Sequence, residues 1–588
     1  MGSRTMGDLE ELARTFRRRI IAHVEQNGGH LASNLGVVEL TIALHRIFDF
    51  PEDRLVFDVS HQCYVHKLLS GRGGECFDRM RRTGGYSGYC DAQESPFDPF
   101  TAGHGGTALS SALGLAVARD LRKDGGHVVA LIGDGSLSCG LTMEALQHVA
   151  GATERLIVVL NDNGHSIDRG VGAVAEHLLE LAGAKNSRRP PCLFRDIHGL
   201  EYIGPVDGHD FSSLLPSLTR AKLSPKPVLV HVCTEKGRGH LRAQATPANF
   251  HGVTVAGNDG SSFQGKDTYS EVFGRCLCAL AEKDPRIVAV TAAMGQGTGL
   301  QPFLEKFPDR FFDVGIAEGH ALTFAAGLAR GGLRPVCAIY SPFIHRAVDN
   351  FFHDICLQNL PVVLCMDRAG LSCSDGDTHH GLFDIALLAG FPNVTFAQPA
   401  SLDELGPLLS AALRVPGPFA MRYPRGVAGN FVPAENPPHP LEMGRATVLR
   451  RGSDLTIWAL GQRRLEQALE LAKILEKQKI STEVVNARFI CPIDRVQLER
   501  SGRCGLVVAM EDHVAAGGFG SLLRMELHAL DVRAEFLSIS WPMPVGFAED
   551  NGTLELRHGQ STEQVLEKIL RAHGHFGRSA GPTEISIP

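Results

Sequence analysis

The chain has 588 residues, of which 44% are hydrophobic and 21% charged, with a formal net charge of −7. This length exceeds one hydrophobic core and predicts about three domains. The sequence has no run of five or more Lys or Arg and no apolar stretch of the roughly 18–20 residues that span a bilayer, so we expect neither a nucleic-acid nor a membrane partner. An N-terminus without an apolar signal core and 14 scattered cysteines indicate a reducing compartment, and we expect a cytoplasmic protein.

The first predicted element is a helix that begins at residue 8. Asp8, followed three residues later by Glu11, has the spacing of a capping box, with Asp8 as the expected N-cap. An apolar stripe at helical spacing follows, made of Leu9, Leu12, Phe16, Ile20 and Val24. Gly28 and Gly29 are predicted to end the helix.

Short apolar runs then alternate with helical patterns, a rhythm typical of parallel α/β sheets. The predicted strands are 128–132, 156–160, 287–290, 336–340, 361–366, 394–397, 455–459, 483–487 and 506–510, and the predicted helices include 143–150 and 563–573. Two stretches rich in Gly, Pro, Ser or Asn, 246–266 and 432–444, predict linkers. We therefore expect three consecutive α/β domains at 1–245, 267–431 and 445–588.

Polar side chains follow two neighbouring predicted strands of the first domain. Asp134 lies in Gly-Asp-Gly-Ser after the strand 128–132, and Asn163 lies in Asn-Asp-Asn after the strand 156–160. The strand–helix–strand path brings both to the carboxyl edge of the sheet, where α/β proteins bind ligands. A carboxylate and an amide oxygen suit Mg²⁺, and the glycines let a diphosphate approach the backbone. Each motif could instead be an ordinary turn, but the pair together is typical of thiamine-diphosphate enzymes.

At this point the sequence resembles the 1-deoxyxylulose-5-phosphate synthases, from about residue 10 to 575. The motifs that carry the resemblance are GGHLAS at 28–33, DVSHQ at 58–62, GH at 103–104, VGIAEGHA at 314–321, DRAG at 367–370, THHG at 378–381, RYPRG at 422–426, EDH at 511–513 and AGGFGS at 516–521. The resemblance implies a homodimer with the transketolase-like fold that binds thiamine diphosphate and Mg²⁺. It also implies decarboxylation of pyruvate and joining of the product to D-glyceraldehyde 3-phosphate, giving 1-deoxyxylulose 5-phosphate and CO₂.

The resemblance also assigns roles to single residues. Glu318 matches the glutamate that hydrogen-bonds and activates the aminopyrimidine ring, a role that suits a carboxyl whose pKa is raised in an apolar pocket. The alternative interpretation of Glu318 is a glutamate at the N-terminus of a helix, where the helix dipole favours a negative charge. The other catalytic matches are His30, His251, Asp375 and His379. The cofactor matches are His61, Gly103, His104, Gly105, Gly135, Ser136, Asn163 and His240, and the metal matches are Asp134, Asn163 and His165.

Further matches surround the acceptor. Arg368 and Arg425 match the pair of arginines that binds the acceptor's phosphate. Arg346 matches a position that flanks this pair, and Tyr340 matches a residue beside the acceptor. Planar guanidinium groups bind phosphate oxygens in pairs, although a surface salt bridge is the ordinary role of a single arginine.

The sequence departs from the family pattern at several of these sites. Ala92 stands where an arginine meets the donor carboxylate, glycines occupy 105, 106 and 319, and His240 replaces an aromatic residue that packs on the cofactor. These departures leave alternatives open: a related carboligase that joins a 2-oxoacid-derived acyl group to another aldehyde, a transketolase, or a binding subunit without catalysis.

Overall fold

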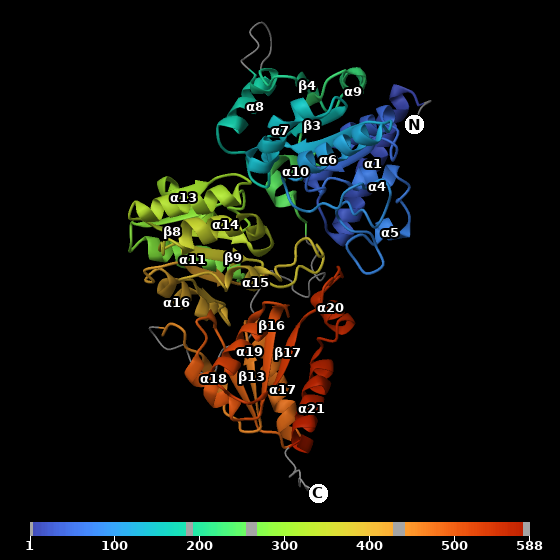
Figure 1. Cartoon of the computed structure of the whole chain (residues 1–588). Helices are drawn as coiled ribbons and strands as arrows, with labels where there is room; N and C mark the ends of the chain where they lie inside the picture. The colour runs from blue at the N-terminus through green and yellow to red at the C-terminus, as the bar shows by residue number, and fades with distance from the viewer. Residues whose placement is uncertain (1–3, 184–191, 254–266, 427–440, 580–588) are drawn as a thin grey trace. The chain divides into compact units, whose positions relative to one another are not determined.

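The computed structural model describes residues 4–183, 192–253, 267–426 and 441–579 (Figure 1). The chain forms two compact units, the first at 1–258 with 292–294 and 313–317, the second at 259–291, 295–312 and 318–588. Most of the predicted linkers, 254–266 and 432–440, lies outside the described residues. The predicted domain limits stay a prediction.

The N-terminal helix α1 (Met6–Asn27) begins earlier than expected. The prediction that Asp8 is the N-cap is wrong, because Thr5 is the cap: its hydroxyl accepts from the Asp8 amide, and the Asp8 carboxylate accepts from the Thr5 amide. Glu11 pairs with Arg14 instead. The helix ends at Gly28, as predicted, where φ is +76°.

The first unit contains a five-stranded parallel sheet in the order β1-β2-β3-β5-β4. Its strands are β1 (Arg54–Phe57), β2 (Val128–Gly133), β3 (Leu156–Asp162), β4 (Glu201–Asp207) and β5 (Val228–Cys233). Its remaining helices are α2 (Ala32–Gly36), α3 (Val38–Ile47), α4 (Tyr64–Leu69), α5 (Glu75–Asp78), α6 (Ala108–Arg122), α7 (Gly140–Ala152), α8 (Ala173–Gly183), α9 (Phe211–Leu223) and α10 (Leu241–Ala245), with 3-10 turns η1 (Asp134–Ser138), η2 (Leu193–Arg195) and η3 (Pro247–Phe250).

Helices cover both faces of this sheet, which explains why its central strands begin with continuous apolar runs. Along β2, Val129 and Leu131 join the core that contains α1, α3 and α9. Val128, Ala130 and Ile132 join the opposite core, with α6 and α7. Successive strand residues point to opposite faces, so residues 128–132 of β2 are all buried, and Gly133 at the end of the strand is half-buried. In β3 the polar residues Asn161 and Asp162 come at the carboxyl end of the strand.

The second unit begins with a seven-stranded sheet in the order β15-β10-β11-β9-β8-β6-β7. Its strands are β6 (Ile287–Thr291), β7 (Phe311–Asp313), β8 (Arg334–Tyr340), β9 (Val363–Asp367), β10 (Thr395–Ala397), β11 (Phe419–Arg422) and β15 (Phe489–Cys491). Its helices are α11 (Tyr269–Ala281), α12 (Gln301–Lys306), α13 (Glu318–Arg330), α14 (Val348–Asn350), α15 (Asp384–Leu388) and α16 (Leu402–Ala412), with short turns η4 (Pro308–Arg310), η5 (Ser341–Ala347) and η6 (Phe351–Cys356). The strand β15 comes from the segment predicted as the third domain and pairs antiparallel with β10.

The third sheet has the order β12-β14-β13-β16-β17, parallel except for the β12–β14 pair. Its strands are β12 (Thr447–Arg450), β13 (Leu455–Ala459), β14 (Thr482–Asn486), β16 (Leu506–Val514) and β17 (Glu535–Trp541). Its helices are α17 (Gln462–Lys477), α18 (Arg495–Gly502), α19 (Phe519–Ala529), α20 (Asn551–Arg557) and α21 (Thr562–Ser579). Three α/β domains with mainly parallel sheets are therefore present, as predicted. No helix among the described residues is long and apolar enough to cross a membrane.

Candidate functional site

Asp134 and Asn163 follow the ends of adjacent parallel strands. Gly133 of β2 lies opposite Asn161 of β3, so both side chains start from the same edge of the sheet, as predicted. Burial, together with the nearby Asp162 carboxylate, raises the pKa of Asp134 to about 7, although Lys236 acts against this. The Asn163 Oδ1 atom accepts from the His165 amide at 3.1 Å, and the His165 ring contacts the Asn163 carbonyl. Two oxygen donors beside a second carboxylate fit a hard divalent cation such as Mg²⁺.

Two glycines of the first unit, Gly135 beside Asp134 and Gly106, stand where a side chain would clash with its neighbours. A Cβ at Gly135 would lie 2.8 Å from the Ser166 Cβ, and a Cβ at Gly106, where φ is +84°, would lie 2.3 Å from the Cys139 Sγ. The surroundings of Gly106 in this chain therefore leave no space for a side chain, and its positive φ favours glycine as well. The neighbouring Gly105 has only ordinary contact distance to Ile316.

Asp58 anchors the loop that carries Gly106 to the strand end of β1. Its carboxylate accepts from the Gly106 and Ala108 amides at 2.9 and 3.1 Å, and from the Ser136 hydroxyl. The predicted cofactor residues Gly103 and His104 lie in the same loop, directly before these contacts. In this structure the Ser136 side chain binds Asp58, which leaves its backbone as the part able to meet a diphosphate.

Three of the predicted histidines lie together. The His30 ring centroid is 5.3 Å from that of His61 and 5.5 Å from that of His251, and His61 and His251 are 5.0 Å apart. Tyr89 lies 5.5 Å from His30 and completes an aromatic cluster that the sequence did not predict. Imidazoles grouped in this way can both donate hydrogen bonds and move protons.

Asn34, also missed, holds the histidine backbone in place. Its amide donates to the His30 carbonyl at 2.6 Å and to the His61 carbonyl at 2.8 Å, and its Oδ1 accepts from the Tyr64 amide. The approach to His61 is strained, because Val59 and Ser60 have φ of +57° and +68°. The position of Asn34, directly after the GGHLAS motif, was the one signal that could have identified it.

His240 has a local structural role, and its contact with the cofactor stays a prediction. Its Nδ1 accepts from the Ala243 amide at 3.1 Å and so caps α10, while its ring lies 5.3 Å from that of Phe250. The residue that replaces an aromatic one in the family thus keeps an aromatic contact.

In the second unit, Glu318 begins α13 and is 3% exposed. Its Oε2 atom has no hydrogen-bond partner among the described residues, and the Arg346 Nη1 atom lies 3.6 Å away. Burial raises the pKa of this carboxyl, the direction the sequence predicted, and Arg346 opposes the shift. A buried carboxyl oxygen without a hydrogen bond fits the amino or ring nitrogen of a pyrimidine.

The predicted acceptor residues come from the strand ends of the second sheet. Arg368, with φ of +63°, places its guanidinium 3.8 Å above the Tyr340 ring. Gly297 makes room for this pair, since a Cβ there would lie 1.9 Å from the Tyr340 hydroxyl. Buried Asp367 has its pKa raised to about 6 by burial, and both Arg368 and Arg425 lower it. Arg368 directly follows Asp367 at the end of β9, and Arg425 follows the end of the neighbouring strand β11. Their joint binding of one ligand stays a prediction.

The loop 369–381 carries the remaining two matches. Gly370 and Gly381 pair in an antiparallel bridge that closes it. The Asp375 carboxylate lies 3.4 Å from the Arg425 Nη1 atom and accepts from the Ser372 hydroxyl at 2.9 Å. The His379 ring meets that of Phe343, which also lies beside Tyr340.

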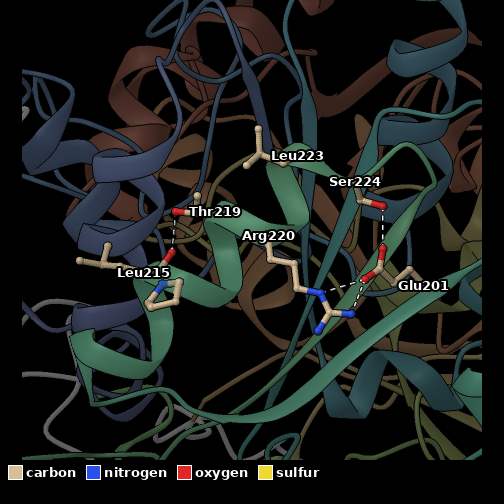
Figure 2. Close-up of a pocket in the computed structure, with 7 residues that line it drawn as sticks. Glu201, Leu215, Thr219, Arg220, Leu223 and Ser224 are labelled. Carbon is tan, nitrogen blue, oxygen red and sulfur yellow. Dashed lines mark hydrogen bonds and ion pairs between the residues drawn. The ribbon is translucent and has the colours of Figure 1, made fainter.

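One hollow in the structure is lined in part by a predicted site residue, and a second hollow is not. A cavity of about 270 Å³ in the second unit is lined by residues of the loop at 369–374, of the segment 424–426 and of the start of α17, among them Ser372, Arg425 and Arg463. A surface hollow of about 720 Å³ along α9, bordered by Glu201 and Arg220, contains none of the predicted residues (Figure 2). Its charged side chains already pair with each other.

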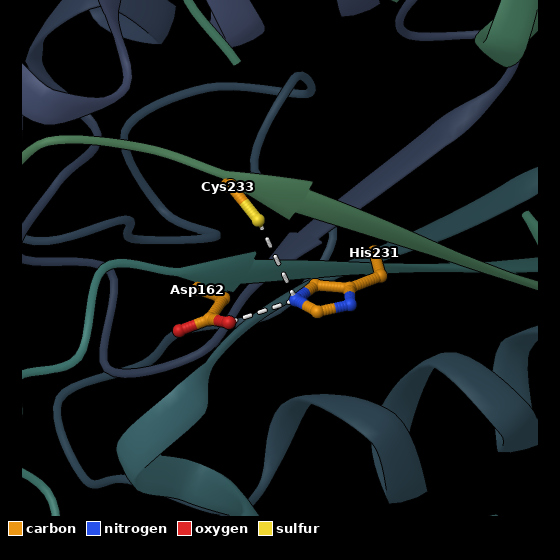
Figure 3. A group of neighbouring side chains, drawn as sticks. All are labelled: Asp162, His231 and Cys233. Carbon is orange, nitrogen blue, oxygen red and sulfur yellow. Dashed lines mark hydrogen bonds and ion pairs between the residues drawn. The ribbon is translucent and has the colours of Figure 1, made fainter. Parts of the chain in front are cut away.

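Among the described residues, one group of three metal-capable side chains lies close together: Asp162, His231 and Cys233 (Figure 3). The His231 Nε2 atom is 2.8 Å from the Asp162 Oδ2 atom and 3.8 Å from the Cys233 sulfur. The shorter distance is that of a hydrogen bond, so these side chains form a polar contact beside Asn163.

Three family models cover most of the chain. They are 1-deoxy-D-xylulose-5-phosphate synthase at 3–189 and 182–234, the transketolase pyrimidine-binding domain at 266–429, and the transketolase C-terminal domain at 444–559.

Curated relatives match over nearly the whole length. The 1-deoxy-D-xylulose-5-phosphate synthase of Methylacidiphilum infernorum is 45% identical over 97% of this chain and 96% of its own length. That of Acidobacterium capsulatum is 46% identical over 95% of each. Among solved structures, transketolase from Campylobacter jejuni is 19% identical, covers 97% of this chain and all of its own, and has a TM-score of 0.44. The assignment rests on the sequence relatives and the family models.

The fold and these matches define a thiamine-diphosphate-dependent transferase of the transketolase type. Within that class, the chain belongs to the 1-deoxy-D-xylulose-5-phosphate synthase family.

Proposed function

We propose that this chain decarboxylates pyruvate and joins the remaining two-carbon unit to D-glyceraldehyde 3-phosphate, giving 1-deoxy-D-xylulose 5-phosphate and CO₂. Bound thiamine diphosphate supplies the electron sink for the decarboxylation. The chain's own residues bind and orient the cofactor and the substrates, and they donate and accept the protons. The 45% identity to relatives of that name over 97% of the chain supports this choice above a transketolase activity.

The first unit would hold the diphosphate and Mg²⁺. Asp134 and the Asn163 amide oxygen are the proposed protein ligands, with the Asn163–His165 turn contributing further oxygen. Gly103, Gly105 and Gly135 would let diphosphate oxygens reach backbone amides near the start of η1.

Glu318 would exchange a proton with the pyrimidine ring. The observation that carries the proposal is the buried state of this carboxyl. A carboxyl that is 3% exposed, with a raised pKa and an oxygen that accepts no hydrogen bond among the described residues, is costly unless a ligand completes it. Arg346, at 3.6 Å, limits that cost without forming a close ion pair.

His30, His61 and His251 would hold the substrate carboxylate and carry protons during the two additions. Arg368 and Arg425 would bind the acceptor's phosphate, with Tyr340, Asp375 and His379 around its carbonyl. Stacking on Tyr340 fixes the direction of the Arg368 guanidinium, which favours paired hydrogen bonds to a phosphate.

The test is a product assay. The purified chain would be incubated with thiamine diphosphate, Mg²⁺, pyruvate and a panel of phosphorylated and free aldehydes, and products identified by mass. We expect 1-deoxy-D-xylulose 5-phosphate as the main product. A larger yield with a different aldehyde would favour the related carboligase, an alternative suggested by Ala92. The homodimer implied by the resemblance and the cytoplasmic location expected from the N-terminus and the cysteines remain predictions, and sedimentation would check the homodimer.

A further inference from the structure

A polar triad of Tyr202, His231 and Asp162 crosses three adjacent strands of the first sheet. The strands β4, β5 and β3 lie side by side, with Asp162 opposite Cys233 in register. The Tyr202 hydroxyl lies 2.8 Å from the His231 Nδ1 atom. The His231 Nε2 atom lies 2.8 Å from the Asp162 Oδ2 atom, a contact drawn in Figure 3. The His231 side chain is completely buried.

The carboxylate fixes the direction of these hydrogen bonds. Because an ionised carboxylate only accepts, Nε2 of His231 donates to Asp162. In that tautomer Nδ1 accepts, and the Tyr202 hydroxyl donates to it. Each of the three groups thus has a partner, as burial demands.

The triad ends beneath the turn that carries the proposed metal ligand. The second oxygen of Asp162, Oδ1, accepts from the Gly164 amide at 3.3 Å, and the Asp162 carbonyl accepts from the Thr234 amide. In the sequence, Asn163 lies between Asp162 and Gly164, which these hydrogen bonds hold in place. A change in the orientation of the Asp162 carboxylate would therefore move the Asn163 turn.

We propose that His231 and Tyr202 are positioning residues for the metal and diphosphate site: they hold the Asp162 carboxylate against the Gly164 amide and so fix the Asn163 amide oxygen for the cation. Without the His231 donor, the buried carboxylate keeps one hydrogen bond and is free to turn toward the Asp134 side of the loop. This inference rests on the proposed function, because it assumes a cation between Asp134 and Asn163.

The test measures metal affinity directly. Free Mn²⁺ would be followed by electron paramagnetic resonance during titration of the full-length protein with saturating thiamine diphosphate. His231→Phe keeps the ring volume but removes the donor, and we expect it to weaken Mn²⁺ binding at least tenfold, the usual effect of losing a group behind a metal ligand. His231→Gln retains an N–H near the Nε2 position and should restore affinity to within about threefold, a rescue that a purely packing role would not give.

Two further variants make the outcome decisive. Tyr202→Phe removes one hydroxyl and should weaken Mn²⁺ binding by a smaller factor; it also replaces His231→Phe if that variant fails to fold. Cys233→Ala removes a neighbour of the same imidazole outside the triad, and its affinity should match the parent's. Equal Mn²⁺ affinity in the parent, His231→Phe and Tyr202→Phe would overturn the proposal, even if thermal stability falls.

Other results separate this inference from its alternatives. A parent protein that binds no Mn²⁺ with thiamine diphosphate would overturn the proposed function itself. Tight Co²⁺ binding with a thiolate charge-transfer band that Cys233→Ala abolishes would also overturn the inference, because the side chains in Figure 3 would then be metal ligands.

Discussion

At the scale of single residues, Glu318 is a buried side chain with one oxygen that has no hydrogen-bond partner among the described residues. Replacement by Gln keeps its volume but prevents proton exchange, so we expect kcat to fall by about 10²–10⁴-fold while cofactor affinity changes little. Steady-state kinetics and calorimetric titration with thiamine diphosphate and Mg²⁺ would measure the two effects.

Glu404 offers a matched control for that experiment. It is 2% exposed, but its Oε1 atom accepts from Arg488 at 2.5 Å. Glu404→Gln should lower the melting temperature and leave the kcat of folded protein unchanged. Parental turnover in Glu318→Gln would show that Glu318 is a structural helix-terminal residue.

Arg425 is the second residue that can be tested alone. If it binds the acceptor's phosphate, Arg425→Ala should raise the acceptor KM and lower kcat/KM by a factor corresponding to roughly 2–3 kcal/mol, because charged hydrogen bonds are lost. Decarboxylation of pyruvate without acceptor should hardly change. Arg414→Ala, on an exposed side chain that bonds Ser410, is the control. An unchanged kcat/KM for the phosphorylated acceptor in Arg425→Ala would contradict the phosphate assignment.

At the scale of secondary-structure elements, the junction of β16 and α19 predicts a pH dependence. The Glu511 carboxylate accepts from the Phe519 and Gly520 amides at 2.6 and 2.8 Å, yet burial raises its pKa to about 7. The folded pKa exceeds the unfolded one, so the stability that protonation contributes is complete at low pH and is lost as the pH rises through about 7.

A comparison with Glu511→Gln isolates this contribution. Between pH 5 and pH 8 the parent should lose roughly 2–3 kcal/mol of unfolding free energy relative to the variant, which cannot ionise. Urea unfolding at several pH values would measure the difference. A difference that does not vary with pH would mean that Glu511 is ionised throughout.

The elements show how far sequence reasoning reaches. The strands β2 and β3 were predictable within one or two residues, because continuous apolar runs between turn residues have few alternatives. Arg368 and Arg425 were placed at strand ends correctly, for the same reason. The helix start was missed because Thr5 and Asp8 satisfy each other's backbone, which Asp8 and Glu11 do not.

Contacts distant in sequence account for what was not predicted. The Asn34 contact to the His61 carbonyl joins residues 27 positions apart, and His231 meets Asp162 across 69 positions. No local pattern marks either pair. The positive φ angles of Val59 and Ser60 likewise result from their surroundings, because neither residue type prefers that region.

At the scale of the whole molecule, cofactor and metal should stabilise the fold together. A ligand at 100 times its Kd adds about 2.7 kcal/mol to a folded state that alone binds it. We therefore expect thiamine diphosphate with Mg²⁺ to raise the melting temperature and EDTA to reverse the rise. Asp134→Ala should melt normally without ligands but show no such rise, as calorimetry would measure. An unchanged rise in that variant would exclude Asp134 as a metal ligand.

The antiparallel strand β15 has a consequence for biosynthesis. Residues 489–491 complete the edge of a sheet whose other strands end by residue 422. In a nascent chain of about 430 residues, β10 therefore pairs with β11 on one side, and its outer edge lacks a partner strand. Open strand edges pair with other chains, which makes this nascent intermediate the stage most exposed to aggregation. A truncated chain that ends at residues 432–444 would keep the outer edge of β10 open permanently. The last third of the chain therefore covers an edge of the second sheet as well as forming its own sheet.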